Sequence, residues 1–159
     1  MSVPDISIII ISYNTKDLLR RCLASVFEHA AGSTAEIFVV DNASSDGSPE
    51  MVKNEFPAVK LIENRENLGF AKANNAALKL MKGEFALLLN SDALLKSGTL
   101  EILTAFAGNN PAAAVIGPRL LNGDGTLQPS TYPLPSLGLE LLKTFKLYEL
   151  LPARLNARL

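Results

Sequence analysis

A chain of 159 residues, 48% of them hydrophobic, is long enough to bury one sizeable core, and its many apolar runs exclude a disordered chain. Fifteen basic and sixteen acidic residues give a formal net charge of −1, which argues against a broad electrostatic hold on nucleic acid or on an anionic membrane. One cysteine, Cys22, and one histidine, His29, exclude an intramolecular disulfide and leave oxygen atoms as the donors for any metal ion.

The first two thirds of the chain alternate between strand-like and helix-like segments. Strands are expected where apolar, often β-branched residues run together, at residues 6–11, 36–40, 59–62, 85–89 and 113–116. Helices are expected where apolar residues recur at helical spacing, beginning at Asn14 and Thr15, at Ser48-Pro49, and over residues 70–81 and 99–107. This order predicts an α/β fold with a mostly parallel sheet and helices on both faces.

The apolar face expected for the first helix consists of Leu18, Leu19, Cys22, Leu23, Val26 and Phe27. The run at residues 6–11 is too short to span a bilayer, and no basic region precedes it. We therefore expect neither a transmembrane span nor a signal peptide, and a cytoplasmic location.

The last third changes in character. A turn signal, Asn122-Gly123-Asp124-Gly125, separates two short apolar pairs and predicts a small hairpin. Prolines then indicate an extended connector, and residues 137–151 fit an amphipathic helix that packs on its own core or offers a face to a partner chain or a membrane surface. The expected division is a core over residues 1–128 and a connector with a helix over residues 129–159.

Polar side chains gather at the expected carboxyl ends of the strands, which is where open α/β sheets bind ligands. Asp41 ends the second strand, where a carboxylate can accept hydrogen bonds from a ribose or a base, or can instead cap the Ser44-Ser45 turn. Asn90 and Asp92 follow the fourth strand, where two oxygen donors suit Mg²⁺ or Mn²⁺ shared with phosphates, although Asp92 could equally cap a turn.

Other signals are weaker. The glycine-rich turn of nicotinamide enzymes and the phosphate loop of P-loop NTPases are both absent. Arg65, Lys72 and Arg119 could neutralise a diphosphate or could be ordinary surface charges. His29, near a helix end, and Cys22, on an apolar face, are interpreted as structural.

Four ordered blocks of sequence together resemble family 2 glycosyltransferases of the GT-A (Rossmann-like) fold, with the rhamnosyltransferase-like branch the most similar. The blocks are IIIISYN at 8–14, VVDNASSDGS at 39–48, NRENLGFAKANN at 64–75 and LLNSD at 88–92. The resemblance covers about residues 6–119, and LQPS at 127–130 also fits the branch.

The resemblance implies roles for individual residues in binding a UDP- or dTDP-linked sugar. Ser12, Tyr13 and Asn14 match the first nucleotide-contacting loop, and Asp41 matches the acid that contacts the base or the ribose. The segment that closes on the nucleotide sugar is matched by Asn67, Gly69, Phe70 and Asn74. Asn90-Ser91-Asp92 matches the Asp-x-Asp element, with Asp92 as the ligand of Mg²⁺ or Mn²⁺ and with Asn90 removing one charge.

The implied activity is inverting transfer of a sugar, such as rhamnose, to a glycan or a lipid-linked acceptor in cell-surface polysaccharide synthesis. The resemblance places the general base in an acidic segment well after the hairpin, whereas the acids past Arg119 are Asp124, Glu140 and Glu149, none in a matching context. We therefore expect a donor-binding portion that transfers sugar poorly by itself, with the base not assigned to any residue.

Two alternatives remain at this level. One is a non-catalytic nucleotide-binding or interaction domain that keeps the fold, and the other is an unrelated Mg²⁺-dependent phosphoryl-transfer domain built on Asp41 and Asp92. Nucleic acid is not an expected partner, whereas peripheral association with the inner face of a membrane and a homodimer through the leucine-rich carboxyl-terminal segment are compatible with the sequence.

Overall fold

The computed structural model describes residues 5–30, 34–130 and 144. The chain forms two compact units, Met1–Ile116 and Gly117–Leu159. The first unit contains the sheet and its helices, and the second contains the hairpin. The division at residue 128 stays a prediction.

Four parallel strands form the sheet of the first unit: β1 (Ile6–Ser12), β2 (Ala35–Asp41), β3 (Lys60–Glu63) and β4 (Phe85–Asn90). Their order is β3-β2-β1-β4, so the chain runs to one side of β1 first and then crosses to the other side. The register pairs Ser12 with Asp41 and Ile11 with Asn90, and the carboxyl ends of these three strands therefore lie side by side. The predicted α/β fold is confirmed.

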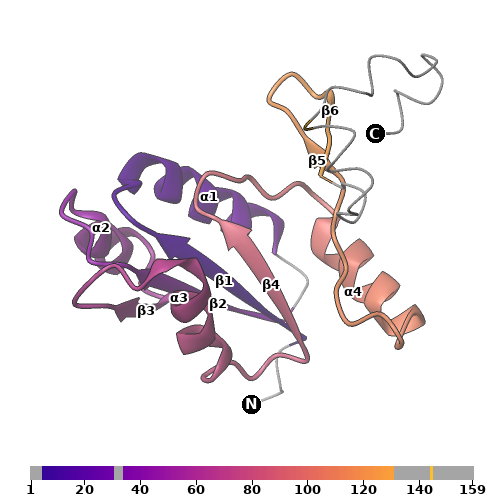
Figure 1. Ribbon diagram of the computed structural model, residues 1–159, viewed down its shortest axis with the longest axis horizontal. Helices are drawn as coiled ribbons and strands as arrows, with labels where there is room; N and C mark the ends of the chain where they lie inside the picture. The colour runs from indigo at the N-terminus through magenta and orange to yellow at the C-terminus, as the bar shows by residue number, and fades with distance from the viewer. Residues whose placement is uncertain (1–4, 31–33, 131–143, 145–159) are drawn as a thin grey trace. The chain divides into compact units, whose positions relative to one another are not determined.

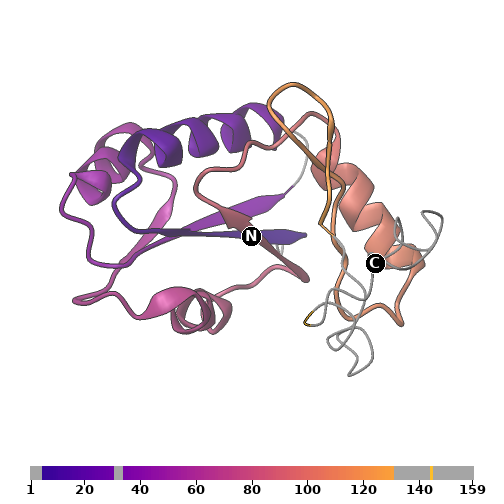
Figure 2. The same ribbon diagram turned by 45° about the horizontal axis from the view of Figure 1, so that its top comes forward.

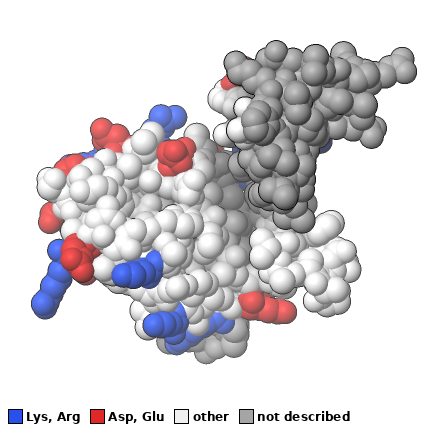
Figure 3. All heavy atoms as spheres, viewed as in Figure 1, with Lys and Arg blue, Asp and Glu red and all other residues white. Residues whose placement is uncertain are grey.

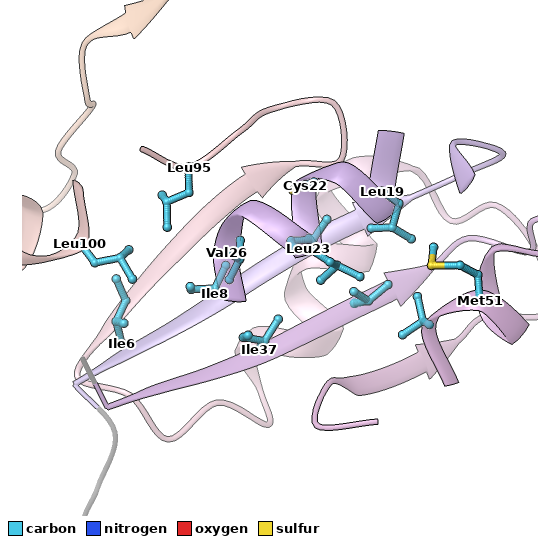
Figure 4. Close-up of a cluster of buried hydrophobic side chains, with 13 residues drawn as sticks. Ile6, Ile8, Leu19, Cys22, Leu23, Val26, Ile37, Met51, Leu95 and Leu100 are labelled. Carbon is cyan, nitrogen blue, oxygen red and sulfur yellow. The ribbon is translucent and has the colours of Figure 1, made fainter. Parts of the chain in front are cut away.

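The helices cover both faces of this sheet, as Figures 1 and 2 show: α1 (Lys16–His29) and α2 (Ser48–Glu55) on one face and α3 (Gly69–Leu78) on the other. A further helix, α4 (Thr99–Asn109), follows β4. The larger core lies beneath α1 and α2, where buried side chains of α1 such as Leu23 and Val26 pack against Ile8 of β1 and Ile37 of β2 (Figure 4). Burial of such aliphatic side chains is the main stabilising contribution to the unit.

The smaller core lies between the sheet and α3 and includes Ile9, Phe38 and Ala73. Strand β4 receives little cover on that face, because Leu88, the register partner of the fully buried Ile9, is 46% exposed. On this face, α3 covers β1 and β2, whereas β4 is largely exposed in the described part of the chain.

Two local expectations are corrected by the structure. Residues 113–116 form no strand, and Val115 is 90% exposed, because a segment half made of alanine offers little side chain to pack and finds no strand to pair with among the described residues. Leu18 and Phe27 are 42% and 41% exposed and lie at the edge of the buried face of α1. The Phe27 ring stacks on Phe56 at a centroid distance of 5.6 Å.

The second unit contains the predicted hairpin, in which β5 (Leu120–Leu121) pairs antiparallel with β6 (Leu127–Gln128). Its turn is closed by Asp124, whose carboxylate accepts hydrogen bonds from the backbone N–H and the hydroxyl of Thr126. The amphipathic helix expected at residues 137–151 lies outside the described residues.

Charged side chains of both signs are intermixed on the face shown in Figure 3. Among the described residues, no helix has the length and apolar content needed to cross a membrane. The mixture of charges agrees with the near-neutral composition.

Candidate functional site

A cavity of about 420 Å³ lies at the carboxyl edge of the sheet, at the point between β1 and β4 where the chain switches sides. Parallel α/β sheets bind ligands at this position because the loops that leave neighbouring strands there diverge and leave a crevice. The cavity is lined by Ile11, Tyr13, Thr15, Leu18, Asn42, Asn67, Gly69, Phe70, Asn90, Ser91 and Asp92.

The structure therefore brings together predicted residues from three separate sequence blocks: Tyr13, Asn67, Gly69, Phe70, Asn90, Ser91 and Asp92. The Tyr13 and Phe70 side chains are 49% and 56% exposed, so two aromatic rings stand in solvent at this cavity. Exposed aromatic rings beside a polar cavity can stack on a planar ligand group.

The turn before α3 is held by a local hydrogen bond, in which the Gly69 N–H donates to Asn67 Oδ1 over 2.9 Å. Gly69 has φ +74°, a left-handed conformation that glycine adopts without strain. The Gly69 carbonyl accepts a long bond of 3.5 Å from Asn42 Nδ2, which ties this turn to the end of β2.

Asn14 is not among the lining residues but braces the loop after β2. Its backbone N–H donates to Ser44 Oγ over 2.9 Å, and its Oδ1 accepts from the Ser45 N–H over 2.8 Å. Asn14 itself has φ +54°, a conformation that asparagine tolerates better than most residues. In the structure, Asn14 therefore holds Tyr13 and the loop at 42–46 in fixed relation.

Asp46, which lies in the sequence block at residues 39–48, completes this brace. Its Oδ2 accepts from the Lys16 N–H over 2.8 Å, and its Oδ1 accepts from the backbone N–H and the hydroxyl of Ser48. One carboxylate thus caps the first turns of both α1 and α2. Burial alone would raise the pKa of Asp46, but the Ser48 hydroxyl and the backbone N–H groups of Lys16, Ser48 and Asp46 itself together lower it. Gly47 rather than Ser48 occupies the N-cap position of α2.

Two buried polar side chains of the first unit each keep one oxygen that has no hydrogen-bond partner among the described residues. Asp41 is 2% exposed, and its Oδ2 accepts from the Ser44 N–H over 2.8 Å while its Oδ1 has no partner. Asn74 is 3% exposed, and its Nδ2 donates to the Phe70 carbonyl over 2.9 Å while its Oδ1 has no partner. An unsatisfied buried acceptor is costly and marks a position where a ligand donor or a water would be stabilised.

Of the two sequence interpretations of Asp41, the structure shows the cap of the Ser44 turn, whereas contact with a base or a ribose stays a prediction. One oxygen caps the Ser44 turn, and the other is left without a partner. Neither Asp41 nor Asn74 lines the cavity. Their neighbours do line it: Asn42 follows Asp41 in sequence, and the Phe70 carbonyl accepts a hydrogen bond from Asn74.

Sequence reasoning missed four lining residues: Ile11, Thr15, Leu18 and Asn42. The sequence predicts Thr15 only as a helix start and Leu18 only as part of the core-facing side of α1. Position was the available signal, because each lies within a few residues of a strand end that already carried a predicted site residue. Asn42 is 2% exposed and accepts from Asn64 Nδ2 over 2.8 Å.

Asp92 is exposed and is the carboxylate among the lining residues. Its charge reaches Cys22, whose thiol donates to the Asn90 carbonyl over 3.6 Å. Burial, and secondarily the negative charge of Asp92, raise the pKa of the Cys22 thiol to about 12. Cys22 is fully buried, which confirms its structural interpretation.

Within the described residues, no group of three His, Cys, Asp or Glu side chains is arranged to hold a metal ion. The protein offers at the cavity one carboxylate, on Asp92, together with the side-chain oxygens of Asn90 and Ser91. This donor set suits Mg²⁺ or Mn²⁺, which are commonly held by one or two carboxylates together with phosphates and water. Arg65 and Lys72 are not among the residues that line the cavity.

The fold and the cavity define an α/β protein with a cavity at the carboxyl edge of a parallel sheet, the position where such folds bind their ligands. The family model for glycosyl transferase family 2 matches residues 7–154, and the chain belongs to this family.

Known proteins similar to this chain agree with that assignment. N-acetylglucosaminyl-diphospho-decaprenol L-rhamnosyltransferase of Mycobacterium tuberculosis (strain ATCC 25618 / H37Rv) is 29% identical over 141 residues, covering 82% of this chain and 46% of that protein. The chain spans about half the length of this relative.

Two solved structures are similar to the chain. Mannosyltransferase PcManGT from Pyrobaculum calidifontis, in complex with GDP-Man and Mn²⁺, is 29% identical with a TM-score of 0.55, over 65% of this chain and 31% of that one. S. aureus TarS 1-349, in complex with UDP, is 29% identical with a TM-score of 0.61, over 67% of this chain and 33% of that one. The predicted family and the GT-A fold are thereby confirmed.

Proposed function

We propose that the cavity at the carboxyl edge of the sheet binds a nucleoside-diphosphate sugar, and that the chain is the donor-binding part of an inverting glycosyltransferase. The observation that carries the proposal is the convergence of three sequence blocks on one cavity, with residues from the ends of β1 and β4 and from the start of α3. Two solved structures similar to the chain hold GDP-Man with Mn²⁺ and UDP, which supports this class of ligand.

In this proposal some of the predicted residues contact the ligand and others support the loops around it. The unpartnered Oδ1 of Asp41 accepts from a base N–H or a ribose hydroxyl, and Tyr13 contacts the nucleoside. The turn from Asn67 to Phe70 closes on the nucleotide sugar, with the Asn74 side chain holding the Phe70 carbonyl.

A divalent ion would be held by Asp92 and Asn90 together with the diphosphate, and it would supply positive charge against the leaving group. Because the described residues offer only Asp92 as a carboxylate at the cavity, most of the ion's ligands must come from phosphate and water. The similar solved structure with Mn²⁺ supports a divalent ion, and the choice between Mg²⁺ and Mn²⁺ is part of the test.

For the rest of the reaction we propose transfer of a sugar, with rhamnose as the first candidate, to a glycan or a lipid-linked acceptor at the inner face of a membrane. The similarity to an L-rhamnosyltransferase supports this choice. Asp124 is not proposed as the general base, because the hydroxyl and N–H of Thr126 both donate to its Oδ1 and lower the pKa of its carboxyl.

The test is calorimetric titration of the 159-residue chain with UDP, dTDP and GDP, with Mn²⁺, with Mg²⁺ and with chelator. The proposal expects saturable binding of at least one nucleotide, strengthened by a divalent ion. Absence of binding by all three nucleotides would overturn it and would favour a non-catalytic interaction domain.

The substitution Asp41→Asn tests whether Asp41 takes part in nucleotide binding. The asparagine keeps an oxygen for the Ser44 N–H but presents an amide donor where Oδ1 was, so nucleotide binding should weaken by about 1–3 kcal/mol. Asp17→Asn is the matched control, because the Asp17 side chain is 89% exposed, and it should bind like wild type. Equal affinities in wild type and Asp41→Asn would remove Asp41 from the site.

A further inference from the structure

Three hydroxyl groups form a hydrogen-bonded chain from the end of β1 to the residue that follows β4. The Oγ of Ser12 lies 3.1 Å from Oγ1 of Thr15, and Thr15 Oγ1 donates to Oγ of Ser91 over 3.1 Å. Ser12 and Ser91 are buried, at 0% and 9% exposed, and both Thr15 and Ser91 line the cavity.

The donor and the acceptor in each bond between these three hydroxyl groups follow from counting protons. A hydroxyl carries one proton, and Thr15 gives its proton to Ser91, so Ser12 must be the donor in the bond to Thr15. Ser91 Oγ therefore receives a proton from Thr15, and its own O–H has no acceptor among the hydrogen bonds of the described residues. Chains of hydrogen bonds polarise one another, which makes the last O–H a better donor.

Thr15 makes this bond in place of a more usual one. It is the N-cap residue of α1, where a threonine hydroxyl ordinarily accepts from a backbone N–H of the first turn. Here its side chain makes no capping bond, and Asp46 Oδ2 accepts from the N–H of Lys16, the first residue of the helix. The Thr15 hydroxyl instead bonds to the hydroxyls of Ser12 and Ser91.

We propose that Thr15 is a positioning residue that aims the Ser91 O–H at a phosphate oxygen of the bound nucleoside diphosphate. The inference rests on the proposed function and adds to it a specific donor and the residue that orients the donor. A phosphate oxygen is the expected acceptor because a polarised neutral O–H forms its strongest hydrogen bonds with ionised oxygens. Asp92, directly after Ser91, lies at the same cavity and would hold the ion that the diphosphate shares.

The test compares UDP and uridine affinities of the 159-residue chain and its variants by calorimetry and ligand-observed NMR. Ser91→Ala should weaken UDP binding about 10- to 100-fold, the range for a hydrogen bond to a charged group, and leave uridine binding unchanged. Thr15→Val removes the hydroxyl but keeps the branched shape, and it should weaken UDP binding about 3- to 10-fold.

Because Thr15 acts through Ser91, the double variant Thr15→Val with Ser91→Ala should bind UDP no more weakly than Ser91→Ala alone. Thr15→Ser restores the hydroxyl and should restore UDP affinity. Thr104→Val is the matched control, because the Thr104 hydroxyl bonds only to α4 carbonyls and lines no part of the cavity.

The outcomes separate the two proposals. If wild type binds neither UDP nor any other nucleoside diphosphate, the proposed function itself fails. If wild type binds UDP but Thr15→Val binds equally well, or if the two substitutions add fully, the positioning role of Thr15 is overturned while the proposed function stands. An equal loss of uridine affinity would overturn the assignment of phosphate as the acceptor.

Discussion

Replacing Glu36 with glutamine should destabilise the first unit strongly, because this carboxylate joins three strands at the amino edge of the sheet. Its Oε1 accepts from the Ser7 hydroxyl on β1 and from the N–H groups of Lys82 and Gly83 just before β4. Its Oε2 accepts from Lys60 Nζ on β3 over 2.6 Å, and the Glu36 side chain is 9% exposed.

The magnitude follows from the pKa of Glu36. Burial alone would raise that pKa, but the bonds from Lys60, Ser7 and the two backbone N–H groups outweigh burial and lower it from 4.5 to about 2. A shift of this size corresponds to about 3 kcal/mol of folding stability, since each pKa unit is worth about 1.4 kcal/mol. The folded pKa lies below the unfolded one, so this stability is present above about pH 4.5 and is lost as the pH falls toward 2.

The assay is urea unfolding followed by circular dichroism at a series of pH values from 7 to 2. At pH 7, Glu36→Gln should lose about 2–3 kcal/mol, and the difference from wild type should shrink between pH 4.5 and 2. Glu63→Gln is the matched control, because Glu63 pairs with Lys53 at 2.8 Å but is 47% exposed, and exposed pairs contribute about 0–1 kcal/mol. A loss below about 0.5 kcal/mol at pH 7, or a loss independent of pH, would refute the reasoning.

Two further predictions concern the metal ion and the sheet. Asp92→Asn should abolish the enhancement of UDP binding by Mn²⁺ and leave metal-free UDP binding unchanged, as measured by calorimetry with and without chelator. An enhancement as large as in wild type would exclude Asp92 as a ligand of the ion. Gly83→Ala should destabilise the protein by about 2–3 kcal/mol in the same urea assay, because a Cβ there would lie 2.6 Å from the backbone N of Ser7. Gly108→Ala is the control and should not destabilise the protein, because a Cβ at Gly108 would meet nothing within 4 Å. Equal effects of the two substitutions would contradict the steric argument.

The fold was predictable because hydrophobic patterning in this chain is local and strong. The run at residues 6–11 is almost wholly aliphatic, and it became the central strand with buried residues on both faces. The prediction failed at residues 113–116, where a short, alanine-rich segment has no partner strand among the described residues. Pairing is a tertiary property, which local composition does not determine.

The position of the site was predictable from the sequence, but the roles of its individual residues were not. Strand ends indicated where Tyr13, Asn67 and Asp92 would meet, because the carboxyl ends of neighbouring parallel strands meet at one edge. Which polar residues face the cavity and which brace the loops depends on hydrogen bonds between residues about 30 positions apart, as for Asn14 with Ser45. No pattern within a single segment carries that information.

The two ends of the sheet differ in whether their polar groups have hydrogen-bond partners among the described residues. At the amino edge, both oxygens of Glu36 accept hydrogen bonds from N–H and O–H donors. At the carboxyl edge, Asp41 Oδ1 and Asn74 Oδ1 are buried without partners, and the Ser91 O–H has no acceptor in the described residues. Unsatisfied groups cost stability, so a fold that keeps them at one edge requires compensation elsewhere, and the hydrogen-bonded Glu36 cluster at the amino edge contributes to it. A ligand that satisfies the open groups would recover that cost, which is why we place nucleotide binding at the carboxyl edge.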